Sequence, residues 1–274
     1  MPITFLGIAR QISSTQFDIT QYYNWGTSTY APLLENDLLV IFGVRAGTVS
    51  TVNVAGWNVL FGGPIRRTPG GTRNVGIGMW WKFRSSLDTT VTVPDMDPLN
   101  PSGRYMIYAF RGVDTASPFD ITPDAVAHVI SGAAVPNPPA VTPLTVGAMV
   151  CYWGCNWSDS GSVNLLWDSP IVGAVAQIES TYSFKYTYLP RLPHRFGHFP
   201  NWTSGVVDGR MSSVYGDASI VPALVLRPAG AGGNIKVWNG SAWVAKPAKV
   251  WNGSAWVTKP VKVWNGTTWV TTKY

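Results

Sequence analysis

Few residues in this sequence have the types and spacing that catalysis or metal binding requires. Among its three histidines, His194 and His198 lie four residues apart in PHRFGHFP, a spacing that would let both bind one metal ion from a helix. The flanking Pro193, Gly197 and Pro200 predict a loop instead, and no third ligand is near in the sequence. We therefore expect these histidines to serve a polar loop or an interface.

Two pairs of acidic residues give a weaker signal. Asp95 with Asp97, and Asp159 with Asp168, could form the carboxylate pair of a glycosidase or part of a calcium site. Spacing along a chain does not show separation in space, so we expect solvated loops here. No G-x-S-x-G motif, Walker loop or G-x-G-x-x-G stands in the context that its chemistry needs. The sequence thus predicts no catalytic residue, no metal site and no cofactor.

The two cysteines, Cys151 and Cys155, occur in MVCYWGCNW. In an extended strand they would share one face at a separation of roughly 13 Å, which is too far for a disulfide. No second cysteine pair or histidine cluster has the spacing of a zinc site. We expect two free and partly buried thiols.

A basic loop, GGPIRRTPGGTR, lies between two predicted strands. Its cluster of Arg66, Arg67 and Arg73 could contact phosphate or an acidic glycan of a bacterial envelope. It could equally contact a neighbouring subunit, and this second interpretation is the one we favour.

Two aromatic loops could bind sugars if their rings were exposed, but buried rings would simply form core or interface. We favour core or interface use. The residues concerned are Tyr22, Tyr23, Trp25 and Tyr30 in the first loop, and Phe196, Phe199 and Trp202 in the second.

The C-terminal part repeats one phrase three times with a period of thirteen residues: KVWNGSAWV at 236–244 and 249–257, then KVWNGTTWV at 262–270. Asn-Gly between short apolar runs predicts a tight two-residue hairpin turn, which also explains the Asn-Gly-Ser/Thr sequons without any sugar. In this register Trp238 opposes Ser241, and the two tryptophans of a repeat share one face as diagonal neighbours. We call each such pair of tryptophans an aromatic plate, and we expect the plates to contact protein or glycan. The residues are Trp238, Trp243, Trp251, Trp256, Trp264 and Trp269.

The net positive charge of the chain comes entirely from these repeats. Residues 1–235 contain fourteen basic and fourteen acidic side chains, whereas the remainder contains six lysines and no acid. Such a basic, aromatic surface could meet phosphates, anionic glycans or a membrane surface. We favour the alternative that evenly spaced lysines keep hairpin edges from aggregating. The lysines are Lys236, Lys246, Lys249, Lys259, Lys262 and Lys273.

Strand-like runs bounded by turn residues recur throughout the rest of the chain, and helical periodicity is found only in ITPDAVAHVI. We predict an all-β protein with an antiparallel β-sandwich body over 1–229, a glycine-rich linker over 230–235 and three short hairpin repeats over 236–274. A single hairpin is marginally stable in water, so the plates should be covered.

Several segments of the body resemble a module of virion structural proteins from tailed bacteriophages, especially those of actinobacteria. The segments are DLLVIF, AGWNVL, WWKF, TVTV, YAFRGVDTASPFD and SIVPALVLRPA, and they span residues 36–229, with Phe110 where tyrosine is commoner. The W-N-G-x-x-W-V repeats resemble the C-termini of phage minor tail and fibre proteins. The resemblance implies a jelly-roll-like β-sandwich in a tail or fibre, without conserved catalytic chemistry.

Within the segment FRGVDTASPFD, a structural lock can be expected. Arg111 and Asp114 leave a strand at a glycine-containing turn, and Asp120 follows Pro118. Arg111 could therefore be held by one or both carboxylates at the end of the sandwich.

Our leading hypothesis is a non-enzymatic minor tail or tail-fibre subunit, located in the virion tail and assembled in the host cytoplasm. It would contact other phage tail proteins and sister chains in a homo-oligomer such as a trimer. The alternative is a receptor-binding adhesin that recognises host cell-envelope glycan through aromatic and basic surfaces. A depolymerase is the weakest hypothesis. Without a signal peptide or a twenty-residue apolar run, we expect no membrane insertion, and we expect no nucleic-acid partner.

Overall fold

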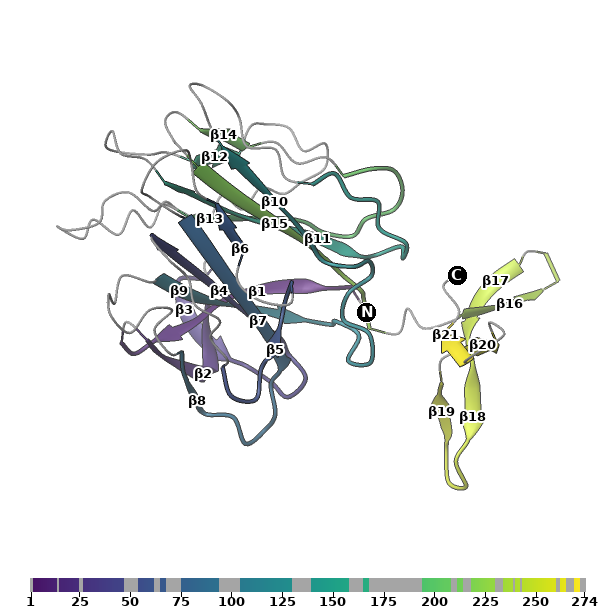
Figure 1. Ribbon diagram of the computed structural model, residues 1–274. Coiled ribbons are helices and arrows are strands. Elements are labelled where there is room, and N and C mark those ends of the chain that lie inside the picture. Colours follow the sequence, from purple (N-terminus) through teal and green to yellow (C-terminus); the bar gives the residue numbers. More distant parts are fainter. Residues whose placement is uncertain are drawn as a thin grey trace.

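The protein is built from antiparallel β-sheets (Figure 1). The computed structural model describes residues 2–13, 15–24, 27–46, 54–61, 65–67, 75–93, 104–129, 139–157, 165–167, 194–207, 211–213, 218–229, 234–238, 240–241, 243–259, 262–264 and 269–271. The prediction of an all-β protein is confirmed, and no helix occurs in these ranges. The one segment with helical periodicity, ITPDAVAHVI, contributes a strand.

The larger sheet has nine strands, with the order β3-β2-β1-β9-β4-β7-β5, while β6 also pairs with β7 and β8 with β2. These strands are β1 (Thr4–Gln11), β2 (Gln16–Asn24), β3 (Thr29–Pro32), β4 (Leu38–Ala46), β5 (Asn58–Val59), β6 (Ile65–Arg67), β7 (Val75–Phe83), β8 (Thr90–Thr92) and β9 (Arg104–Arg111).

The second sheet has four strands in the order β10-β15-β11-β13, and a separate pair is formed by β12 and β14. Their bounds are β10 (Asp124–Val129), β11 (Met149–Trp157), β12 (Leu165–Trp167), β13 (His194–Phe199), β14 (Met211–Ser213) and β15 (Ala218–Leu226).

The main hydrophobic core lies where these two sheets face each other. In β4, Leu38, Val40 and Phe42 point into this core, and from the opposite sheet Trp153 and Leu224 do the same. Trp153 contacts the rings of Tyr108, Phe110 and Phe196 at centroid distances of 5.5, 6.5 and 4.9 Å. Removal of apolar surface from water is the dominant favourable term in folding, and large aromatic rings contribute much of that surface here.

The outer faces of both sheets are buried as well, which accounts for the nearly continuous apolar runs in the sequence. Leu39 and Ile41 of β4 belong to a second core that includes Phe17 and Ile19 of β2. Val150 and Tyr152 of β11 belong to a third core with Val141 and other loop residues. Side chains alternate between faces in a strand, so a strand covered on both sides must be apolar at every position.

The C-terminal repeats form three two-stranded antiparallel sheets. They are β16 (Asn234–Trp238) with β17 (Trp243–Pro247), β18 (Lys249–Trp251) with β19 (Trp256–Thr258), and β20 (Lys262–Trp264) with β21 (Trp269–Thr271). In the described part of the repeats, every strand pairs only with the other strand of its own hairpin.

The register of these hairpins corrects one prediction. Trp238 lies opposite Trp243, not Ser241, and the other two hairpins place Trp251 opposite Trp256 and Trp264 opposite Trp269. The tryptophans are therefore direct cross-strand partners rather than diagonal neighbours. Four residues, not two, connect the paired tryptophans.

Candidate functional site

The loop of the middle hairpin explains the corrected register. The side-chain Oδ1 of Asn252 accepts hydrogen bonds from the backbone N–H groups of Ser254 and Ala255, at 3.0 and 2.8 Å, and from the Ser254 hydroxyl at 3.1 Å. Gly253 has a φ of +103°, which favours glycine. Because the asparagine side chain takes the place of a backbone acceptor, the turn is one residue further along than a simple Asn-Gly turn.

The middle hairpin exposes a pair of tryptophan rings. The ring centroids of Trp251 and Trp256 are 5.8 Å apart with an interplanar angle of 58°, and the two residues are 51% and 65% exposed. Trp238 of the first hairpin is 52% exposed. At least half of the surface of each of these three tryptophans is therefore exposed.

The two faces of this hairpin differ in chemistry. Lys249 lies two residues before Trp251 on β18 and so shares its face, while Val250 lies opposite Val257 on the other face. Lys249 and Val250 are both exposed. We call Lys249, Trp251 and Trp256 the Trp/Lys face.

Arg111 is held by a carboxylate that the sequence did not indicate. Its Nε and Nη2 atoms donate to Asp37 at 2.8 and 2.7 Å. Asp37 directly precedes β4, whose Leu38 pairs with Phe110 of β9, so the strand register brings the two residues together. These hydrogen bonds raise the pKa of the Arg111 guanidinium. The prediction that Asp114 or Asp120 holds Arg111 is therefore wrong.

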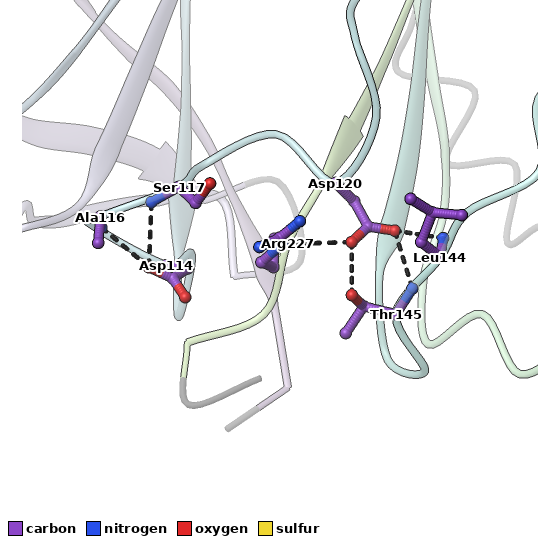
Figure 2. A network of polar contacts seen from close by, with 7 residues as sticks. All are labelled: Asp114, Ala116, Ser117, Asp120, Leu144, Thr145 and Arg227. Carbon is purple, nitrogen blue, oxygen red and sulfur yellow. Dashed lines mark hydrogen bonds and ion pairs between the residues drawn. The ribbon is translucent and has the colours of Figure 1, made fainter. Parts of the chain in front are cut away.

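Asp120 instead organises a second, more deeply buried network (Figure 2). It is 1% exposed and accepts hydrogen bonds from the backbone N–H groups of Leu144 and Thr145, the Thr145 hydroxyl and the Arg227 Nε, the last at 3.3 Å. A buried carboxylate needs such partners because burial removes it from hydrogen bonds with water. Asp120 thus ties a loop and the end of β15 to the segment after β9.

Asp114 has a local role. Its Oδ1 accepts from the backbone N–H groups of Ala116 and Ser117 at 2.9 and 3.2 Å (Figure 2). This arrangement fixes the turn between the two sheets.

The segments FRGVDTASPFD and ALVLRPA contact each other along their length. Val113 bridges to Pro228 and Phe119 to Leu226, and the Asp120 N–H donates to the Val225 carbonyl at 2.7 Å. The first segment leaves the larger sheet at β9, while the second is the end of β15 in the smaller sheet. Together they join the two sheets at one end of the body.

Replacement of Gly112 by alanine should destabilise this junction. Gly112 has a φ of +82°, and an added Cβ would lie 2.6 Å from the Pro2 carbonyl oxygen. We expect the free energy of unfolding to fall by about 2–3 kcal/mol in urea titration. Gly56→Ala is the matched control, because Gly56 has a φ of +76° and nothing within 4 Å, so about 1 kcal/mol is expected. Equal effects at both sites would contradict the close contact with Pro2.

The cysteines and two of the histidines are neighbours across a strand pair. His194 and His198 belong to β13 rather than to a loop, so that prediction is wrong, and the register places Cys151 opposite His198 and Cys155 opposite His194. Both cysteines are free and fully buried, and burial raises the pKa of Cys151 and raises that of Cys155 to about 12. Thiols that resist ionisation are poor nucleophiles and metal ligands.

Several predicted candidates have no described side chain. Arg66 and Arg67 belong to β6, of which the backbone is described, while Arg73 lies outside the described residues. The acidic residues considered for chemistry also lie outside them: Asp95, Asp97, Asp159 and Asp168. Among the residues that the structure describes, no group of three potential metal ligands gathers.

Most residues of the two predicted aromatic loops belong to strands of the body, so the loop prediction is wrong for them: Tyr22 and Tyr23 lie in β2, Tyr30 in β3, and Phe196 and Phe199 in β13. Tyr22, Phe196 and Trp202 are buried, as predicted for core residues. Tyr30 is exposed and meets the ring of Tyr23 edge-on at 5.3 Å. Trp25 lies outside the described residues.

Comparison with known proteins identifies no relative: no family model, curated protein or solved structure matches this chain. In the described ranges, no helix is long and apolar enough to cross a membrane.

Proposed function

We propose that this chain is a non-enzymatic structural subunit of a bacteriophage virion, a minor tail or tail-fibre protein with a jelly-roll-like body and a C-terminal array of Trp-rich hairpins. The observation that carries the proposal is the contact between FRGVDTASPFD and ALVLRPA. The resemblance to phage virion proteins rests most strongly on FRGVDTASPFD, and ALVLRPA resembles the end of the last strand of the same module. Because the two segments contact each other, they belong to one structural unit, and this supports the proposal.

The hairpins support a role in assembly. A two-stranded hairpin is marginally stable alone. In the middle hairpin, Val250 is 52% exposed on one face and Trp256 is 65% exposed on the other. We infer that a sister chain or another tail protein covers the face that carries Val250.

Immunoelectron microscopy tests the virion role. Gold-conjugated antibodies raised against the purified chain should label the tails of purified phage particles from the source culture. Labelling that is absent from intact and from partially dissociated tails would overturn the proposal.

A second candidate function, a receptor-binding adhesin, is favoured by the exposure of the tryptophans. A ring that stacks on a sugar must be open to solvent, and Trp238, Trp251 and Trp256 are about half exposed or more. In a competition assay, the full chain should reduce adsorption of phage to host cells, whereas a chain ending at Gly233 should not. Equal competition by both would place host binding outside the hairpins.

A further inference from the structure

We propose that the Trp/Lys face binds one repeating unit of a linear acidic polysaccharide, and that the corresponding residues of the other two sequence repeats bind the same polysaccharide chain. The inference rests on the adhesin function proposed above and specifies the ligand. Lys249, Trp251 and Trp256 form this face in the middle hairpin, and the other two hairpins have the same backbone register.

The geometry of this face suits a sugar. The rings of Trp251 and Trp256 lie 5.8 Å apart and are inclined at 58°, so they offer two adjacent apolar surfaces at an angle. The apolar C–H face of a pyranose packs against such rings, and its hydroxyl groups remain in water. Lys249 stands at the end of the same face, where its ammonium group can meet an acidic substituent.

Charge indicates that the ligand is anionic. The part of the chain from 236 onward carries six lysines and no acidic side chain, whereas the preceding part is balanced. Both Lys249 and Lys259 are exposed. A field of one sign raises the local concentration of an oppositely charged ligand.

The size of the face favours a sugar unit over a folded protein. A stable protein interface needs about 800 Å² on each partner. Two half-exposed tryptophans, which bury about 150–250 Å² each when fully covered, supply much less than that. Three copies of the same sequence at thirteen-residue spacing instead suit a ligand that itself repeats, because weak sites joined in one chain gain avidity.

Single-stranded nucleic acid also repeats, but it fits less well. It presents one phosphate per base and prefers to stack bases on aromatic platforms. The Trp/Lys face provides one lysine for two rings, and the rings are inclined rather than parallel. One acid group per two-sugar repeat matches this ratio of charge to aromatic surface.

The test measures binding of the full chain to immobilised polymers by biolayer interferometry. The acidic probes are alginate, which carries carboxylates, and phosphomannan, which carries phosphates; dextran is the neutral probe and oligothymidylate is the nucleic-acid probe. We expect binding to at least one acidic probe to be tenfold or more tighter than to dextran, and to weaken at high ionic strength. The acidic probe that binds identifies the acid group.

Substitutions then locate the site. Trp251→Leu with Trp256→Leu keeps an apolar cross-strand pair but removes the rings, and we expect affinity to fall about tenfold to a hundredfold as one of three sites is lost. The tyrosine pair at the same positions should restore most of it. Lys249→Gln should weaken binding more than Lys259→Gln, which removes the same charge from the opposite face.

Four results would overturn the inference: binding to neither acidic probe, equal binding to dextran, tighter binding to oligothymidylate, or no effect of the leucine pair. The light-scattering mass of the leucine variant separates this inference from the assembly proposal. Lost binding with an unchanged mass supports the inference. Absence of binding by an intact oligomer overturns it while leaving the tail-subunit proposal standing.

Discussion

Substitution of Asp120 by alanine is expected to lower the free energy of unfolding by about 3–5 kcal/mol, measured by urea titration followed by circular dichroism. Asp120 is the acceptor for Arg227, Leu144 and Thr145, and both members of the ion pair are buried. Removal of the carboxylate leaves a buried guanidinium and two backbone N–H groups without their acceptor. Such groups cost more than the lost hydrogen bonds themselves.

The double substitution Asp120→Ala with Arg227→Met is the control. It removes the buried cation together with its partner, so the loss of stability should be smaller than for Asp120→Ala alone. A single-variant loss below about 1 kcal/mol would show that the network in Figure 2 does not hold the sheets together.

Acidification should destabilise the body through His198, well above the pH at which carboxylates titrate. His198 lies against Phe5 and Phe196 with Cys151 opposite, its Nδ1 has no hydrogen-bond partner, and burial lowers its pKa to about 4. The unfolded chain binds this proton more readily, so stability is complete above pH 6.5 and is lost as the pH falls toward 4. The loss should reach about 2 kcal/mol at pH 5 and about 3 kcal/mol at pH 4.

His198→Phe provides the control, because the site is already lined by aromatic rings. The variant should lack most of the destabilisation between pH 6.5 and 4.5. Burial would raise the pKa of Asp88, but hydrogen bonds from Lys82 and Ser85 outweigh it and lower that pKa, so Asp88 contributes to acid unfolding only at lower pH. If wild type and variant lose stability equally across this window, His198 is not the group responsible.

The sequence predicted many strands of the body but not their partners. Runs such as LLVIF and AMVCYW are apolar at every position because both faces of β4 and β11 are buried. Arg111 and Asp37 are separated by 74 residues, and only the pairing of β4 with β9 makes them neighbours. The turn residues near Arg111 favoured Asp114 and Asp120 as its partners, but these two carboxylates have other partners.

Local sequence preferences also gave incorrect predictions for the histidines and for the register of the hairpins. Proline and glycine around His194 and His198 predicted a loop, yet the pairing of β13 with β11 overrides that local preference. In the middle hairpin, Asn-Gly correctly indicated a turn, and Trp251 and Trp256 share a face. The cross-strand partner of Trp251 lies two residues beyond the predicted one, because Asn252 uses its side chain, not its backbone, as the acceptor.

The most direct test of the assembly role is the light-scattering mass of the purified full chain at micromolar concentration, beside a chain that ends at Gly233. The account predicts a homo-oligomer, with a mass that is a multiple of 29.8 kDa, and a smaller assembly or a monomer for the shortened chain. A full-length chain that remains at 29.8 kDa would contradict the proposal that its hairpins are covered by sister chains.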